Sequence, residues 1–325
     1  MEETKLKYFS SSPHVKGRRT TRGIMLDVCI ALLPACIAGC VFFGWRALMI
    51  IALSAVTACA SEIVYLLILR RPLKKILAEF DFTSLVTGLL LAMCLGSQVP
   101  WYVPVLSAIF AIVVVKMLFG GTGKNLVNPA ATGRIFAFLS FGAAMTSGWL
   151  SPLTGEVLTG ATSLTGLLES GQMPDNLSLL LGNVAGCIGE TCKIALIAGG
   201  VYLVIRGVID WKWPVIYIAV TGLVAVALNK FDFNYFLPSV LGGGLILGAI
   251  FMATDYTTSP NTTWGCAIYY VLLGAVTAVL RHATGIEVVS FAILLMNLFV
   301  PLIDKFVINR PFGFVRQKRK KEAQQ

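Results

Sequence analysis

Apolar stretches about as long as a bilayer is thick recur along this chain. A helix of ~20 residues spans the ~30 Å hydrocarbon core of a membrane, and the run at residues 24–43 has that length. Hydrophobic residues make up 57% and charged residues 13% of the chain, a balance that leaves a water-soluble fold with too much apolar surface to bury. The sequence therefore predicts an all-α polytopic membrane protein.

The apolar segments predict about ten transmembrane helices, some of them short or interrupted by glycine. The predicted spans are residues 25–44, 47–69, 83–98, 102–119, 130–147, 189–205, 213–229, 236–253, 265–280 and 287–304.

The basic residues predict the orientation of these spans. If the amino terminus is cytoplasmic, most of the 26 Lys and Arg residues fall on the cytoplasmic side, and the outer loops hold only Arg46, Lys230 and Arg281. A bias of this kind places both termini inside. Residues 1–24 and 305–325 then form basic cytoplasmic segments. The basic residues lie between apolar runs, without an aromatic-interleaved surface, so the +10 net charge does not indicate a nucleic-acid partner.

The longest loop, residues 148–188, falls outside and contains no Lys or Arg. It separates a first five-helix unit, residues 25–147, from a second, residues 189–304, and an odd number of spans inverts the second copy. A Phe-Asp-Phe sequence precedes the third segment of each half, at 80–82 and 231–233. We therefore expect a 5+5 inverted repeat with broken helices; the alternative is that small residues only tighten helix packing.

The external loop contains a short run of small residues, Thr159-Gly160-Ala161-Thr162, followed by Ser163. Small neighbours on an exposed loop leave a threonine hydroxyl accessible to a modifying enzyme. Taken alone, the run is a small-residue turn.

Four longer stretches of the sequence resemble those of a known family, and they change how this run is interpreted. Over about residues 15–312 the chain resembles the D subunits of the Rnf complex, an ion-translocating ferredoxin:NAD oxidoreductase, and it is similar to the B subunits of the sodium-pumping NADH:quinone reductase. The stretches that carry the resemblance are residues 82–92, 120–131, 182–190 and 252–255. The resemblance implies an electron-relaying subunit of a bacterial inner-membrane translocase, with other Rnf subunits and a flavin-transferring enzyme as partners.

The resemblance also implies a covalent cofactor. In that family FMN is joined through its phosphate to the last threonine of a Ser/Thr-Gly-Ala-Thr signature, which places a phosphoester on Thr162, with Thr159, Gly160, Ala161 and Ser163 beside the flavin. Two positions depart from the usual signature: Glu156 stands where Asp is common, and Ser163 where Pro is common. Neither change removes the hydroxyl.

The loop from Gly120 to Asn125 is glycine-rich but does not match a Walker A sequence, because Asn125 replaces Ser or Thr and no strand precedes it. The resemblance allows a second, noncovalent flavin such as riboflavin near Asn125, Asn128 and Arg134. A purely structural loop is the alternative.

Ionisable residues inside spans are costly and often mark ion routes. Glu62 and Asp255 are the ion-pathway candidates, and the coupling ion stays open between Na⁺ and H⁺. Glu62 could instead be the buried partner of a neighbouring helix or of a sister subunit. Lys116 can extend its ammonium group to the membrane surface.

No catalytic residue and no metal site are predicted. The eight cysteines contain no Cys-x-x-Cys pair, and the chain has two histidines. Cys187 and Cys192 are close enough in sequence to form a disulfide. The rival functional hypothesis is a non-redox transporter or channel of related inverted-repeat fold.

Overall fold

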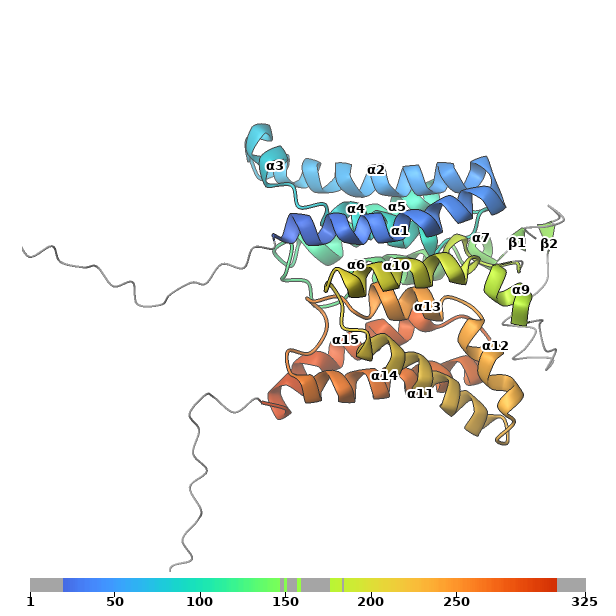
Figure 1. Cartoon of the computed structure of the whole chain (residues 1–325). Coiled ribbons are helices and arrows are strands. Elements are labelled where there is room, and N and C mark those ends of the chain that lie inside the picture. Colours follow the sequence, from blue (N-terminus) through green and yellow to red (C-terminus); the bar gives the residue numbers. More distant parts are fainter. Residues whose placement is uncertain (1–19, 147–148, 151–156, 159–175, 183, 309–325) are drawn as a thin grey trace, which may run out of the picture.

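The computed structural model describes residues 20–146, 149–150, 157–158, 176–182 and 184–308. In this part of the chain the long helices lie side by side along one common direction (Figure 1). The elements of the first half are α1 (Thr21–Phe43), α2 (Trp45–Ile68), α3 (Leu73–Glu79), α4 (Thr83–Met93), α5 (Tyr102–Ile109), the π-helix η1 (Phe110–Met117), α6 (Pro129–Ser140) and α7 (Gly142–Thr146).

Two short strands and one short helix belong to the segment between the halves. They are β1 (Trp149–Leu150), β2 (Val157–Leu158) and α9 (Asn176–Leu181). The strands pair antiparallel, with Trp149 opposite Leu158, and are a small exception to the predicted all-α fold. The elements of the second half are η2 (Ile188–Glu190), α10 (Lys193–Ile205), α11 (Lys212–Leu228), η3 (Phe233–Tyr235), α12 (Phe236–Leu241), α13 (Leu245–Leu247), the π-helix η4 (Gly248–Met252), α14 (Thr263–Thr284) and α15 (Val289–Phe306).

Each of the predicted apolar segments contains helix, but not every helix is long enough to cross a bilayer. Among the described residues, α1, α2, α14 and α15 are long and apolar enough, and two bent pairs, α3 with α4 and η3–α12 with α13–η4, pass the same test together. The apolar helices α5–η1, α10 and α11 are shorter. The structure is thus that of a helical membrane protein, and the number of about ten spans stays a prediction.

The first bent pair breaks at its Phe-Asp-Phe sequence, residues 80–82, whereas the second begins at Phe233, the end of its Phe-Asp-Phe sequence, and breaks at residues 242–244. The first bends by 68° and the second by 67°. In each Phe-Asp-Phe sequence the aspartate accepts a hydrogen bond from the backbone N–H two residues later, Thr83 on Asp81 at 3.1 Å and Asn234 on Asp232 at 3.0 Å. The two halves therefore share an Asx turn before their third segment. This agrees with the predicted inverted repeat, which as a whole stays a prediction.

Several predicted boundaries differ from the helix ends. Helix α4 ends at Met93 because the chain beyond it pairs with the second half: the Ile188 N–H donates to the Leu95 carbonyl at 3.0 Å, and Gly96 forms a bridge with Cys187. Helix α6 ends at Ser140 and is followed by α7, and α10 begins at Lys193, after η2. The end of α4, at least, is set by contacts far apart in sequence.

Helices of the two halves pack against each other in matching pairs: α1 lies on α10, and α6 lies on α15. The first contact is very close, since a Cβ on Gly199 of α10 would lie 2.1 Å from the carbonyl oxygen of Ala31. Small residues that let helix backbones approach are typical of membrane proteins. Large apolar side chains meanwhile point outward, including Val41 at 77% and Ile205 at 79% exposure, which suits a lipid solvent.

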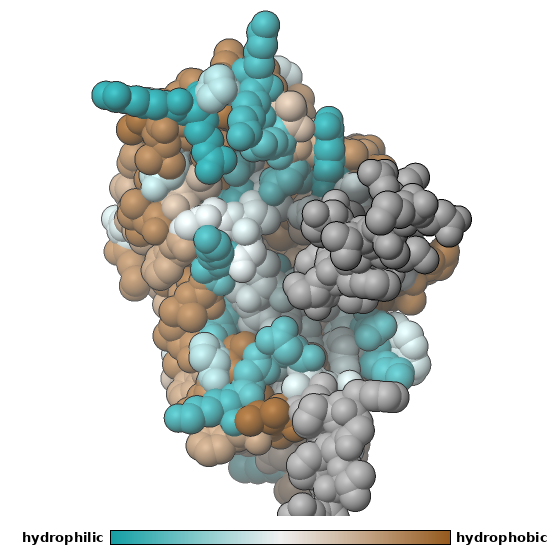
Figure 2. Space-filling model, turned by 90° about the vertical axis from the view of Figure 1, so that its left-hand side faces the viewer, coloured by the Kyte–Doolittle hydropathy of each residue, from teal (hydrophilic) through white to brown (hydrophobic). Residues whose placement is uncertain are grey.

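The bundle has two distinct ends. Helix α1 begins and α15 ends at the left of Figure 1, whereas α7, β1, β2 and α9 lie at the right. Figure 2 views the left end, where hydrophilic side chains gather above and between hydrophobic ones. The exposed basic residues Arg70, Arg71, Lys74 and Lys75 belong to α3 and the turn before it, at this end.

Candidate functional site

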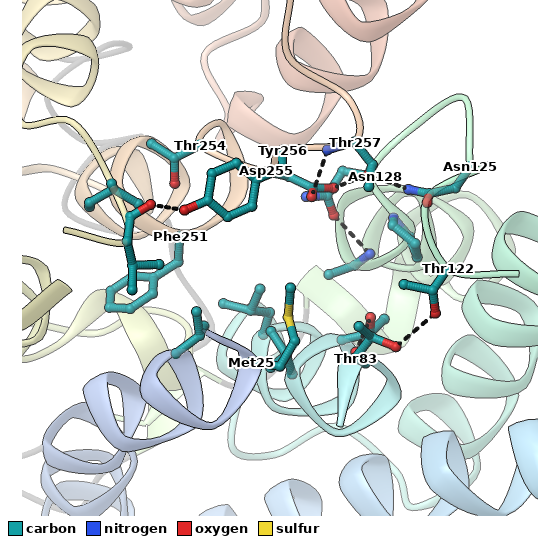
Figure 3. A pocket seen from close by; sticks show the side chains of 18 of the residues that line it. Met25, Thr83, Thr122, Asn125, Asn128, Phe251, Thr254, Asp255, Tyr256 and Thr257 are labelled. Atoms are coloured by element: carbon teal, nitrogen blue, oxygen red, sulfur yellow. Dashed lines mark hydrogen bonds between the residues drawn. The ribbon is translucent and has the colours of Figure 1, made fainter. Parts of the chain in front are cut away.

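A cavity of about 110 Å³ lies where the two halves of the chain meet. Figure 3 shows side chains converging on it from the start of α1, the start of α4, the segment before α6 and the segment after η4. Its apolar wall comes from Met25, Val28, Val86, Leu90, Leu203, Ile209, Ile250 and Phe251. A hollow with one apolar wall and a few converging polar groups is the usual form of a small-molecule site.

The polar wall joins the loop after η1 to the turn after η4. The Asn125 side-chain amide donates to the Thr257 hydroxyl at 3.0 Å. The Asn128 amide donates to the Met252 carbonyl at 3.0 Å, and its own oxygen caps α6 by accepting from the backbone of Ala130 at 3.0 Å. Both asparagines are buried. The glycine-rich loop is therefore held rigidly across the two halves.

Asp255 lies in the turn that follows η4, with its carboxylate held by neighbouring threonines. It accepts from the backbone N–H and the hydroxyl of Thr257, at 3.2 and 2.9 Å, and from the Thr258 hydroxyl at 3.4 Å (Figure 3). Burial raises the pKa of Asp255, and the threonine hydrogen bonds only partly oppose this. The carboxylate is thus placed on the cavity and is easier to protonate than an exposed aspartate.

Asp81 forms a second aspartate–threonine turn on the opposite side of the cavity. The Thr83 hydroxyl donates to it at 2.6 Å and the Thr122 hydroxyl at 2.8 Å, and Thr83 and Thr122 both line the cavity. Burial acts to raise the pKa of Asp81, but the hydrogen bonds from Thr83 and Thr122 and the nearby Lys116 cation outweigh it, so the pKa is lowered. The loop after η1 therefore contacts both aspartate turns, through Thr122 and Asn125.

A buried ion pair adjoins this wall. The Lys116 ammonium lies 3.0 Å from Glu62 Oε1 and also donates to the Thr83 hydroxyl. Lys116 is 3% exposed, so the expectation that it reaches the membrane surface is wrong: its partner on α2 keeps it inside. Of the two hypotheses for Glu62, partnership with a neighbouring helix is confirmed, and a role in an ion pathway stays a prediction.

Among the described residues that line the cavity, Lys116 is the one cation, and it is paired with Glu62. A free Lys or Arg is a common and strong partner of a phosphate group. The cavity is therefore better suited to a neutral, largely apolar and partly polar molecule than to a phosphorylated one.

A larger hollow of about 420 Å³ adjoins the cavity, and the two share Val208, Ile209, Thr254 and Tyr256 in their walls. The Tyr256 hydroxyl donates to the Val208 carbonyl. Tyr256 thus stands between the inner cavity and a more open space lined by Asp210, Trp213 and Asn261.

Arg134, predicted beside Asn125 and Asn128, does not line the cavity. It points from α6 toward the second half, where it donates to the Ser290 hydroxyl at 3.2 Å and lies 3.8 Å from Glu190 Oε1. A further pair, Arg281 with Glu287 at 2.7 Å, is also buried. Arg134 thus contacts the second half and does not line the cavity with the two asparagines, and its role beside a second flavin stays a prediction.

The residues of the predicted covalent site, Thr159, Gly160, Ala161, Thr162 and Ser163, lie outside the described residues. The described residues nearest to them in sequence, Val157 and Leu158 of β2, lie at the right end of Figure 1. The beginning of α1 and the end of α15 lie at the other end.

Sequence reasoning misses part of the site. It singles out Asp81 only as part of a repeated Phe-Asp-Phe sequence, and it does not identify Thr83 and Thr122 as site residues. The signal that could have found them is the repeated Asp-aromatic-Thr sequence, at 81–83 and 255–257. All eight cysteines are free, so the Cys187–Cys192 disulfide is wrong, and the described residues contain no group of side chains arranged to hold a metal.

Comparison with known proteins gives matches over almost the whole chain. A family model described as NQR2, RnfD, RnfE matches residues 8–313. The chain is 41% identical, over 97% of its length and 98% of the relative's, to the D subunit of the Na⁺-translocating ferredoxin:NAD⁺ oxidoreductase complex of Acetobacterium woodii. It is 37% identical, over 94% and 95%, to the D subunit of the proton-translocating ferredoxin:NAD⁺ oxidoreductase complex of Clostridium ljungdahlii. It is 35% identical, over 91% and 93%, to the D subunit of an ion-translocating oxidoreductase complex of Stutzerimonas stutzeri.

Proposed function

The chain belongs to the NQR2, RnfD, RnfE family, and on this premise we propose that it is the membrane flavoprotein subunit of an ion-translocating ferredoxin:NAD oxidoreductase. It relays electrons through covalently bound FMN and helps to couple that transfer to the movement of Na⁺ or H⁺. Electrons enter and leave through other subunits of the Rnf complex, which are its partners.

The observation that carries this proposal is the Thr-Gly-Ala-Thr signature at 159–162, in a chain that matches the family from residue 8 to residue 313. The Thr162 hydroxyl bonds to the phosphate of FMN, and a flavin-transferring enzyme forms that bond. A covalent tether keeps the flavin in place at an exposed loop, and the flavin supplies the electron-carrying chemistry that side chains lack. Thr159, Gly160, Ala161 and Ser163 form its immediate surroundings.

We place a second, noncovalent flavin such as riboflavin across the cavity between the halves and the adjoining hollow of about 420 Å³, because the cavity of about 110 Å³ alone is smaller than the roughly 300–1,000 Å³ of ordinary ligand pockets. The apolar wall from Met25 to Phe251 suits a flat ring system, and the Asn125 and Asn128 amides and the Asp255 carboxylate suit its polar edge and hydroxylated chain. The lining offers no unpaired cation among the described residues, which favours riboflavin over its phosphorylated forms. This site lies at the end of the bundle opposite to β1 and β2, and two carriers at the two ends would conduct electrons along the membrane normal.

Glu62 and Asp255 are the residues we assign to the ion path. Glu62 is buried within α2, and Asp255 lines the cavity, so both place a carboxylate where it can meet an ion away from bulk water. The relatives' names include both a Na⁺-translocating and a proton-translocating complex, and the coupling ion of this chain stays open between the two.

The proposed setting is the bacterial inner membrane. Both termini are cytoplasmic, and the Thr162 loop lies on the outer face. This orientation rests on the distribution of Lys and Arg, and the common position of the beginning of α1 and the end of α15 agrees with it (Figure 1).

The experiment that tests the function is replacement of Thr162. Protein purified from a host that has the flavin-transferring enzyme should show flavin fluorescence in a denaturing gel. Thr162→Ala should abolish it, and Thr154→Ala, the matched control in the same loop but outside the signature, should keep it. Fluorescence that survives Thr162→Ala would overturn the attachment site, and a colourless wild-type protein would overturn the electron-carrier role.

One structural observation favours a second candidate function. Helix pairs bent by 68° and 67°, with buried charges nearby, resemble the broken helices of secondary transporters. A non-redox transporter or channel would lack flavin and would move a small solute in vesicles, so the same purified protein distinguishes the two.

A further inference from the structure

Lys116 contacts an ion-pair partner on one side and the cavity on the other. Its ammonium lies 3.0 Å from Glu62 Oε1 on α2. The same side chain donates to Thr83 on α4 and lines the cavity. One flexible cation thus lies between a buried carboxylate and the place where a redox group would bind.

Glu62 is only half satisfied by this arrangement. Its second oxygen, Oε2, is buried and has no hydrogen-bond partner among the described residues, and the residue is 7% exposed. A buried carboxylate that loses its cation is strongly unfavourable. If Lys116 moved away, Glu62 would have to take up another cation.

We propose that Lys116 couples the charge of the cavity's occupant to a monovalent-cation site at Glu62. The inference rests on the proposed function, in which the cavity holds a flavin. When one electron arrives from the ferredoxin side of the complex, the added negative charge draws the ammonium toward the cavity. Glu62 then takes one cation, either a proton on Oε2 or a Na⁺ held by its two oxygens. When the electron leaves toward NAD⁺, the ammonium returns and the cation departs.

The charges balance in each step: one electron and one cation enter together, and both leave again.

Few titratable groups face the Lys116–Glu62 pair among the described residues. Cys59 lies on the same helix as Glu62, Asp81 accepts from the Thr83 hydroxyl that Lys116 contacts, and Asp255 lies across the cavity. A lysine suits the role because its four-carbon stem is flexible and its charge is compact. It also stands in the π-helix η1, a backbone form frequent at functional sites.

A purely structural role is the alternative to exclude. In that case Lys116 would only hold η1 against α2, and its loss would lower stability without changing any signal linked to reduction. Lys116→Met alone leaves Glu62 without a cation and endangers folding. The Lys116→Met/Glu62→Gln double variant is neutral at both positions, leaves no unpaired buried charge, and so can be measured even if the single variant does not fold. Lys116→Arg retains the charge.

The test is redox-difference infrared spectroscopy on the full chain carrying Thr162→Ala, so that the remaining flavin is the noncovalent one. Extraction and chromatography first establish the flavin content. A chain without flavin overturns the cavity assignment and this inference with it. If flavin is present, we expect one of two results on its reduction. A carboxylic-acid band appears in Na⁺-free buffer, or a shifted carboxylate band appears when Na⁺ is added. Glu62→Gln should remove the band in either case. The first outcome identifies H⁺ and the second Na⁺.

Lys116 decides the outcome. Lys116→Met should lose the reduction-linked band although Glu62 is still present, because Glu62 then stays neutralised in both states. Lys116→Arg should restore part of the band, and the double variant should show none while binding flavin. A band of wild-type size in Lys116→Met, or no change sensitive to Glu62→Gln with or without Na⁺, would overturn the coupling and leave the flavin site standing.

Discussion

The Asn125 side-chain amide donates to the Thr257 hydroxyl at 3.0 Å and so joins residues 132 positions apart, from the two halves of the chain, at the wall of the cavity. This bond holds the glycine-rich loop against the turn that contains Asp255. It makes the loop part of a site built from both halves.

Replacing Asn125 should weaken the noncovalent flavin site. Asn125→Ala removes one polar group from the wall and the hydrogen bond to the exposed Thr257, a change worth roughly 0.5–1.5 kcal/mol. We expect the Kd for riboflavin, measured by fluorescence quenching, to rise about two- to tenfold. Leu126→Ala is the control, because Leu126 is the next residue and is exposed. Equal affinity in both variants would remove Asn125 from the site.

Arg134 should behave as a structural residue. Arg134→Met leaves Glu190 buried without its cation, which should destabilise the protein by about 3–5 kcal/mol and lower its Tm while flavin stoichiometry in the folded fraction is unchanged. Arg46→Met, which breaks an exposed contact with Gln98, should have little effect on Tm. If Arg134→Met lost flavin without losing stability, the arginine would belong to the cofactor site after all.

The close contact between α1 and α10 predicts that replacing Gly199 by alanine lowers the stability of the protein. Alanine normally favours a helix over glycine by about 1 kcal/mol. At Gly199, however, the new Cβ would lie 2.1 Å from the Ala31 carbonyl oxygen, and overpacking of this kind costs typically about 1–3 kcal/mol. Gly199→Ala should therefore lower the Tm in detergent. Gly142→Ala, where nothing lies within 4 Å of the added atom, should leave it unchanged or raise it, and the same result at both sites would contradict the packing.

Asp81 and Asp255 should respond to pH with opposite signs. The pKa of Asp81 is lowered from 3.8, so its ionised form stabilises the fold above that value, and this contribution is lost as pH falls through the folded-state pKa. The pKa of Asp255 is raised from 3.8, so its stabilising protonated form is lost as pH rises through the folded-state pKa. In thermal unfolding, the Tm of Asp81→Asn should lie below that of the wild type at neutral pH and approach it at acidic pH. The stability of Asp255→Asn should rise relative to that of the wild type as pH rises above 3.8. Parallel plots of stability against pH for the two variants would refute the assignment.

The sequence predicted the helical segments well because hydrophobic length is a local property. It predicted their ends less well: α4 stops at Met93, where Leu95 pairs with Ile188, a residue far along the chain. For the site, the sequence singled out Asn125, Asn128 and Asp255, and the structure brings all three to one cavity, while their roles toward a flavin and an ion stay predictions. It could not show that Lys116 stays buried, because that depends on Glu62, 54 residues away. Nor could it show that Arg134 faces Glu190, because this needs the packing of the two halves.

The central claim is that Thr162 carries a flavin, and peptide mass spectrometry of residues 148–188 from native membranes tests it most directly. The account predicts a peptide heavier than its sequence by FMN less one water, with the added mass localised to Thr162. An unmodified peptide from cells whose ion-translocating complex is demonstrably active would contradict it.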